Sequence, residues 1–168
     1  MKTLQRLFSL LVLTSAFACS SVEVDYAYGA KSFSGFGPKF AWAETTVEAD
    51  AEVPADVLAF IHDTIERGLT DKGYAKASTG AEADFQVAYR VSKKFAIKSS
   101  PNNDLTHYEE GALDVFVMMP KSAELMWRGT AHAAMDKSLT PTERRERLQE
   151  GVSKMLKNFP DAGTQAKR

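Results

Sequence analysis

Three segments of the chain alternate apolar and polar side chains with a period of two, which is the pattern of strands buried on one face. They cover residues 83–92, 107–119 and 125–135. In the first segment the apolar positions are Phe85, Val87, Tyr89 and Val91. Two shorter segments of the same kind lie at 22–26 and 39–44. Such strands form a sheet with one apolar face, and that face needs a covering layer.

Two other segments, 54–72 and 140–160, carry their apolar side chains at helical spacing on one side only. Pro54 and Gly73 are suited to the start and the end of the first helix. Thr140 and Glu143 have the spacing of a capping box, with proline between them at the first helical position. The chain is therefore predicted to be an α+β protein: a two-layer sandwich, with a largely antiparallel sheet of about five strands and two helices packed on one face.

The polar stretch 93–106 contains Pro101-Asn102-Asn103, so we expect the chain to turn there. Lys93, Lys94 and Lys98 make it the one local basic run. A solvated loop is the ordinary explanation for such a run. Contact with anionic lipid headgroups or lipopolysaccharide is the alternative, because basic side chains near a membrane surface each contribute about 1 kcal/mol.

The first 18 residues have the parts of a secretory signal. Lys2 and Arg6 give a positive start, an apolar run covers 7–13, and Ala16-Phe17-Ala18 puts small residues at the first and third positions before residue 19. The run is shorter than the about 20 apolar residues of a membrane-spanning helix. We therefore predict that residues 1–18 are a signal peptide.

Cys19 is the only cysteine of the chain, so it cannot form an intramolecular disulfide. Its place directly after the signal resembles the bacterial lipobox, in which the sulfur takes a diacylglycerol and the signal is cut just before it. Several acyl chains anchor a protein firmly, since each buried CH₂ contributes about 0.8 kcal/mol. Ser20, where Asp would signal retention, resembles lipoproteins sent to the outer membrane of Gram-negative bacteria. Ala16 and Phe17 depart from the lipobox, and a soluble periplasmic protein is the alternative.

The charge of the mature chain argues against nucleic acid as a partner. Removal of 1–18 takes away two of the 21 basic residues and none of the 22 acidic ones, which leaves 19 against 22 and a net charge near −3. A nucleic-acid-binding protein needs a positive field to displace phosphate counterions. The remaining 150 or so residues fit one soluble domain, with 44% hydrophobic and 26% charged residues in the whole chain.

Several stretches together resemble one family. They read VDYAYGAKSFSGFGPKFAWAE, LTDKGYAKAS, ADFQVAYRV, YEEGALDVFVMMPKSAELMWRGTA and TPTERRERLQEGVSKMLKNFP. The family they resemble is DUF4136, bacterial lipoproteins of the cell envelope with unknown function, and the resemblance covers nearly all of residues 22–160. Met119-Pro120 departs from the usual sequence of the hairpin turn. The resemblance implies an α/β sandwich tethered to the outer membrane, and it supplies no catalytic residues.

These sequence features predict that the chain has four parts. Residues 1–18 are the lipoprotein-type signal peptide, and 19–35 are a lipid-anchored segment with the first short strand. Residues 36–160 are the DUF4136-like domain, and 161–168 are a disordered tail.

The densest polar cluster is His107-Tyr108-Glu109-Glu110. Neighbouring residues of a strand point to opposite faces, so the two glutamates are not expected to bind one ion together. The three histidines share no metal-binding motif, and neither a G-x-S-x-G sequence nor a phosphate-binding loop occurs. We therefore predict no catalytic residue, no metal and no cofactor.

Two hypotheses follow for the function. Asp114 and Arg128 are expected to form an ion pair across the hairpin, and Glu109, Arg128 and His132 are the candidate surface for a partner or ligand. The first hypothesis is a non-enzymatic lipoprotein at the periplasmic face of the outer membrane, which binds another envelope protein or lipopolysaccharide. The alternative is a periplasmic small-ligand-binding protein or hydrolase, with a cleft between the sheet and the helices.

Overall fold

The computed structural model describes residues 22–28, 37–47, 52–99, 102 and 104–164. The predicted signal peptide 1–18, Cys19, parts of the segment 19–35 and the last four residues of the predicted tail lie outside the described residues.

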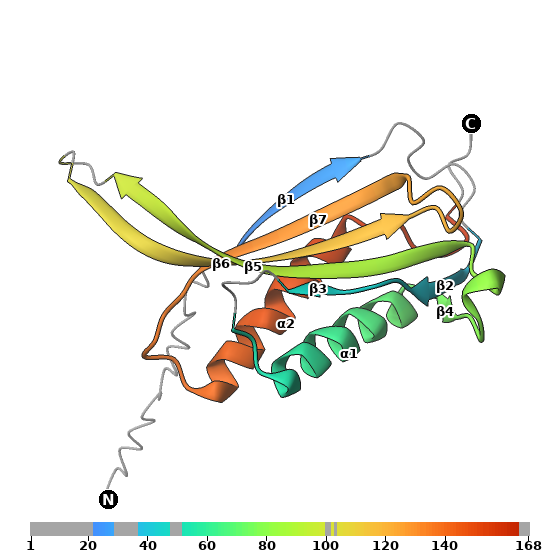
Figure 1. Ribbon diagram of the computed structural model, residues 1–168, viewed down its shortest axis with the longest axis horizontal. Helices are drawn as coiled ribbons and strands as arrows, with labels where there is room; N and C mark the ends of the chain where they lie inside the picture. The colour runs from blue at the N-terminus through green and yellow to red at the C-terminus, as the bar shows by residue number, and fades with distance from the viewer. Residues whose placement is uncertain (1–21, 29–36, 48–51, 100–101, 103, 165–168) are drawn as a thin grey trace, which may run out of the picture.

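The described residues form one sheet and two helices, arranged as two layers (Figure 1). The strands are β1 (Glu23–Tyr28), β2 (Lys39–Trp42), β3 (Thr46–Val47), β4 (Ala75–Lys76), β5 (Phe85–Ser99), β6 (Leu105–Met118) and β7 (Leu125–Ala134). The helices are α1 (Ala55–Asp71) and α2 (Pro141–Lys157), and a short 3₁₀ turn η1 covers Gly80–Glu82. Both helices lie on one face of the sheet, which confirms the predicted α+β sandwich. No helix in the described part of the chain is long and apolar enough to cross a membrane.

The order of the strands along the sheet is β1-β7-β6-β5-β2-β4, and β3 also pairs with β5. This path has six strands where about five were predicted, because the two-residue strand β4 extends the edge beyond β2. The pairs from β1 to β5 are antiparallel. β2 and β3 pair with β5 in parallel, because α1 carries the chain back across the sheet before β4 and β5 begin. The sheet is therefore largely antiparallel with one mixed edge.

The core lies between the sheet and the helices, as the alternating and helical patterns predict. Trp127 of β7 is fully buried and contacts Phe159 after α2, with 5.1 Å between the ring centroids. The next residue on the same face, Gly129, leaves room for this indole, because a Cβ there would lie 2.5 Å from Trp127 Cη2. From α1, the core receives Ile61, Ile65 and Leu69.

The predicted starts of both helices are confirmed to within a residue or two. Thr140 Oγ1 accepts a hydrogen bond from the Glu143 amide, and the Glu143 carboxylate accepts one from the Thr140 amide, so the capping box is complete. Gly73 ends the first helix with φ 87°, which is the left-handed region that favours glycine.

The stretch 93–106, predicted to be a polar turn, is instead mostly strand. β5 continues to Ser99 and β6 already begins at Leu105. Two of the three lysines that suggested a loop are paired across the strands: Lys93 Nζ lies 2.9 Å from Glu109 Oε1, and Lys94 Nζ lies 3.0 Å from Glu110 Oε2. Backbone pairing and these ion pairs extend a two-stranded arm beyond the helices (Figure 1). We call residues 94–99 and 105–110 the β5–β6 arm.

The first residues of the predicted disordered tail belong to the folded body. Asp161 Oδ1 lies 2.9 Å from Lys72 Nζ. The Ala162 amide donates a hydrogen bond of 2.8 Å to the Lys72 carbonyl, and the Ala162 side chain packs on the core. Residues 161–164 therefore pack at the C-terminal end of α1.

Candidate functional site on the outer face of the sheet

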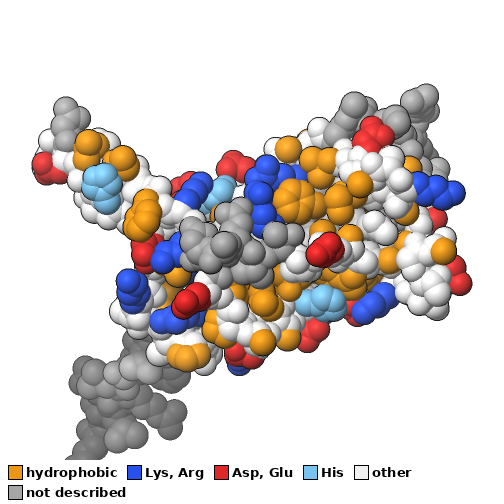
Figure 2. Space-filling view, in the orientation of Figure 1, with side chains coloured by type: hydrophobic (Ala, Val, Ile, Leu, Met, Phe, Trp, Pro, Cys, Tyr) orange, Lys and Arg blue, Asp and Glu red, His pale blue; other side chains and the backbone are white. Residues whose placement is uncertain are grey.

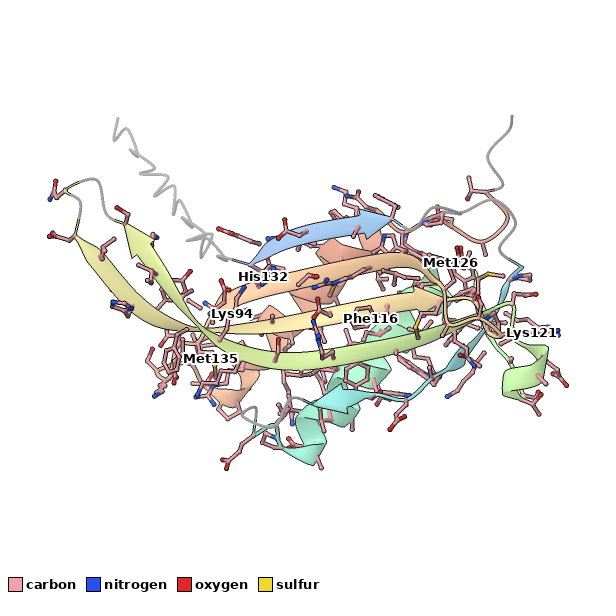
Figure 3. All side chains as sticks on the ribbon, turned by 45° about the horizontal axis from the view of Figure 1, so that its top comes forward. Lys94, Phe116, Lys121, Met126, His132 and Met135 are labelled. Atoms are coloured by element: carbon pink, nitrogen blue, oxygen red, sulfur yellow. The ribbon has the colours of Figure 1, made fainter. Side chains whose placement is uncertain are left out.

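The face of the sheet that the helices leave uncovered carries a row of polar side chains from β1, β5, β6 and β7 (Figure 3). Register places Arg90, Asp114 and Thr130 directly opposite one another on β5, β6 and β7. Phe116 and Arg128 form the next pair along β6 and β7. Residues that face each other in an antiparallel pair project to the same side, so these five side chains gather in one cluster.

Asp114 is the centre of this cluster. Its Oδ2 accepts hydrogen bonds from Arg90 Nε at 3.0 Å and Nη2 at 2.7 Å. Its Oδ1 accepts from Arg128 Nε at 2.9 Å and Nη2 at 2.7 Å, and from Thr130 Oγ1 at 2.6 Å. Each arginine thus donates two hydrogen bonds to one carboxylate oxygen, and such charge-assisted bonds are stronger than bonds between neutral groups. The predicted Asp114–Arg128 ion pair is confirmed, and Arg90 joins it from the other side.

Burial and hydrogen bonding act in opposite directions on Asp114, whose side chain is only 2% exposed. Burial raises the pKa of the carboxyl, but the hydrogen bonds from Thr130, Arg90 and Arg128 lower it more, so that the pKa lies below its ordinary value. The group is therefore ionised at neutral pH. With five donors on its two oxygens, it has no lone pair directed at a substrate proton or a metal ion.

The ring of Phe116 completes the cluster. The guanidinium carbons of Arg90 and Arg128 each lie 5.7 Å from the centroid of this ring, within the range of a cation–π contact. The aspartate, the two arginines and the ring together form a unit with one net positive charge. The two arginine side chains remain 37% and 38% exposed, so the unit presents guanidinium edges to the solvent.

A second group of charges lies nearer the β5–β6 arm, and Figure 3 labels two of its members, Lys94 and His132. Glu110 Oε2 pairs with Lys94 and lies 3.8 Å from His132 Nδ1, while His132 Nε2 lies 3.4 Å from Asp25 Oδ2. A lysine, a glutamate, a histidine and an aspartate thus follow one another from β5 to β1 across this end of the outer face.

The structure brings together two of the three residues predicted as a partner surface. Arg128 and His132 are both on the outer face of β7, four residues apart. Glu109 projects to the opposite face, where it contacts Lys93 and Lys137, and the hydrogen bond from Lys93 is the main cause of its lowered pKa. The prediction that Glu109 and Glu110 point to opposite faces is confirmed, and Glu110 takes the place expected for Glu109.

The three histidines lie apart in the fold. His62 on α1 stacks on Trp42, with 4.1 Å between the ring centroids, and Trp42 Nε1 donates to Glu66 at 2.9 Å. His107 is on the β5–β6 arm and His132 on β7. Among the residues that the structure describes, no three His, Cys, Asp or Glu side chains come close enough together to hold a metal ion.

A groove of about 430 Å³ lies between α1 and α2. Thr64, Gly68, Val152 and Leu156 line its floor, and charged side chains of both helices form its rim. The alternative hypothesis placed a cleft between the sheet and the helices, whereas this groove follows the seam between the two helices. None of the predicted surface residues lines it.

Arg90, Phe116, Thr130 and Glu110 lie on the outer face but were not among the residues predicted for the partner surface. Their signal was parity: Arg90 occupies the polar side of 83–92, and Glu110, Asp114 and Phe116 share one parity within 107–119. Parity alone does not determine which residues of β5 and β6 stand opposite each other. The register of the two strands determines that pairing.

The family model DUF4136, described as a domain of unknown function, matches residues 22–161. Among solved structures, a DUF4136 family protein from Bacteroides thetaiotaomicron is similar, with a TM-score of 0.57, 13% identity, and coverage of 81% of this chain and 94% of that one. A PDZ domain protein from Parabacteroides distasonis has a TM-score of 0.55 and 14% identity over 83% of this chain. Only 36% of that protein is covered, so this chain spans about a third of its length.

A minor lipoprotein from Acinetobacter baumannii also matches, with a TM-score of 0.41 and 10% identity, over 71% of this chain and 87% of that one. At 13% and 14% identity, the likeness to the Bacteroides and Parabacteroides structures concerns the fold alone. The sequence matches no curated protein.

Proposed function

The chain belongs to the DUF4136 family, and we propose that it is a lipoprotein of the bacterial envelope, anchored through Cys19 at the periplasmic face of the outer membrane. Its domain binds another envelope component without catalysing a reaction. The proposal is supported by the signal and the lipobox-like cysteine in the sequence, and by the partly exposed arginines on the outer face of the sheet.

The observation that carries the anchor is the short stretch of chain between Cys19 and the first core residue, Val22. Val22 is only 8% exposed and belongs to the hydrophobic core. Its carbonyl accepts a hydrogen bond of 3.4 Å from Lys154 Nζ. The described part of the fold thus starts with the core residue Val22, three residues after the cysteine, and three residues span at most about 11 Å. A lipid on Cys19 would hold the body of the protein directly against the membrane surface.

The binding role is supported by the chemistry of the outer face. A general base needs a free lone pair and a pKa near the working pH, whereas Asp114 has both oxygens occupied and a lowered pKa. Arginines stacked on an aromatic ring, with part of each guanidinium exposed, are instead typical of protein contact surfaces. We assign the partner surface to Arg90, Phe116, Arg128 and His132.

Labelling with a radioactive or clickable fatty acid tests the anchor. We expect the native chain to take up the label and to fractionate with membranes. Cys19→Ala removes the sulfur and should lose both, whereas Ser21→Ala is the matched control and should keep both. A native chain that takes up no label, with an unacylated amino terminus by mass spectrometry, would refute the anchor.

Density-gradient separation of envelopes tests which of the two membranes holds the protein. The native chain is expected in the outer-membrane fraction, and Ser20→Asp is expected to move it to the inner-membrane fraction. Labelled protein in the inner membrane in both cases would leave the anchor standing and contradict the location.

The partner surface is tested by a photo-crosslinking amino acid placed in intact cells. Ser92 lies on the outer face, opposite Ala112 and in line with His132. Asp63 is exposed on α1, on the other side of the molecule. We expect a discrete crosslinked product from position 92, lost with Arg128→Glu, and none from position 63. Equal crosslinking from both positions would contradict the assignment.

A further inference from the structure

The β5–β6 arm carries an apolar face that nothing in the described structure covers. Of the six large apolar side chains exposed in the described part of the chain, four lie on the arm or at its base: Phe95, Ile97, Leu105 and Met135. Phe95 is 78% exposed, Leu105 64% and Ile97 59%. Clusters of exposed apolar side chains mark surfaces that contact another molecule or a membrane.

These side chains share one face of the arm. Phe95 and Ile97 have the parity of the core residues Val87 and Tyr89, and Leu105 stands opposite Ser99, which has the same parity. The core face of β5 thus continues past the ends of the helices, where no layer packs on it. Figure 2 shows hydrophobic side chains on this projection, separated from the body of the protein.

The arm projects from the end of the sheet at which β1 begins (Figure 1). Glu23 is in register with His132, which is level with Ala112 and Ser92. From Ser92 to Ser99, β5 advances seven residues, or about 23 Å at the rise of a strand. The chain between Cys19 and Val22 reaches at most about 11 Å. A membrane that holds Cys19 therefore lies within reach of the arm.

We infer that the β5–β6 arm is a second membrane contact, in which Phe95, Ile97 and Leu105 insert into the interface of the bilayer that anchors Cys19. This inference rests on the proposed anchor. Two contacts fix the orientation of the domain, because an acyl anchor alone leaves the domain free to rotate about the amino terminus. The outer face, with Arg90 and Arg128, is then held at a constant angle to the membrane for its partner.

The charge of the arm indicates which lipid chemistry it meets. Glu109 and Glu110 neutralise Lys93 and Lys94, which leaves Lys98 as the one other lysine of the arm, so attraction to anionic headgroups is weak there. Burial of the apolar side chains drives the contact instead. We therefore expect the same insertion into phosphatidylcholine vesicles and into vesicles of phosphatidylethanolamine with phosphatidylglycerol, with little dependence on salt.

The test uses the full lipidated chain, reconstituted into vesicles. Because acylated Cys19 has no free thiol, Ile97→Cys or Leu105→Cys introduces the single site for a polarity-sensitive fluorophore. Lys121→Cys is the matched control, since Lys121 is exposed in the turn after β6, at the far end of the sheet (Figure 3). Circular dichroism verifies that each labelled variant is folded. The probe is quenched either by lipids brominated in the acyl chain or by iodide in the water.

We expect blue-shifted emission at positions 97 and 105, strong quenching by the brominated lipids and a several-fold loss of iodide quenching relative to position 121. If positions 97 and 105 are as accessible to iodide as position 121, the inference is overturned. Flotation of the protein with the vesicles would in that case still support the anchor. Shielding from iodide without quenching by lipid would also overturn it, and would assign the arm to a protein or a second copy. Protein that fails to float with the vesicles would remove the anchor and the inference together.

Discussion

Asp114 and Arg128 meet at 2.7 Å on the outer face of the sheet although they are not cross-strand partners, because the residue opposite Asp114 on β7 is Thr130. The guanidinium reaches back along the strand to Asp114 Oδ1, which also accepts from the Thr130 hydroxyl. Arg90 approaches the other oxygen from β5. One carboxylate thus joins the three central strands of the sheet.

Asp114→Asn should destabilise the protein, because it leaves two arginines close together without their counter-charge. We expect a loss of about 2–3 kcal/mol in the free energy of unfolding, less than for a fully buried pair because water reaches both guanidiniums. Urea unfolding followed by tryptophan fluorescence measures it. Asp63→Asn, at a carboxylate that is 74% exposed, is the control and should change stability by less than about 0.5 kcal/mol. Equal stability of the two variants would contradict the structural role of Asp114.

Lowering the pH should remove the stabilisation by the Asp114 carboxylate from the wild-type protein. The hydrogen bonds from Thr130, Arg90 and Arg128 outweigh burial and hold the pKa of Asp114 below its ordinary 3.8, so the unfolded chain binds this proton more readily than the folded one. The stabilisation is complete above pH about 5 and is lost as the pH falls through the folded-state pKa. The difference in stability between wild type and Asp114→Asn should therefore begin to narrow as the pH falls below about 5, and should keep narrowing as the pH falls past 3.8 to the lower folded-state pKa. A difference that stays constant over this range would contradict the lowered pKa.

Thr140→Ala should weaken the start of α2. It removes the hydroxyl that accepts from the Glu143 amide and donates to the Glu143 carboxylate at 2.7 Å. We expect a loss of about 1 kcal/mol in the free energy of unfolding, the usual value for a helix cap. Thr140→Ser keeps the hydroxyl and should stay within a few tenths of the wild type. If both variants lose the same free energy of unfolding, the loss comes from the missing methyl group and not from the missing cap.

Gly129→Ala should be destabilising although alanine is small. Its Cβ would lie 2.5 Å from Trp127 Cη2 and 3.0 Å from Met155 Cγ, so the buried indole would have to move against α2. Overpacking of this kind costs about 1–3 kcal/mol. Gly80→Ala is the matched control, because no heavy atom lies within 4 Å of its added Cβ, and it should be neutral or slightly stabilising. Thermal unfolding of the two variants makes the comparison, and similar melting temperatures would show that the core near Trp127 adapts at little cost.

The periodicity of the sequence by itself determined the type of the main elements and the faces that they bury. Alternation along 83–92 and a helical stripe along 54–72 are local properties, because a side chain's direction depends on its own backbone. The cap at Thr140 and the stop at Gly73 are local in the same sense, since each needs only a few neighbouring residues. Opposite parity likewise separated Glu109 from Glu110.

Only the tertiary structure decided which strands lie side by side and in which register. Arg90 and Asp114 are 24 residues apart, and nothing local states that they stand opposite each other. The same holds for Lys93 and Lys94, whose positive charges suggest a loop until pairing places Glu109 and Glu110 beside them. The length of the β5–β6 arm and the exposure of Phe95 and Ile97 follow from that pairing and from where the helices end, which depend on contacts between distant parts of the chain.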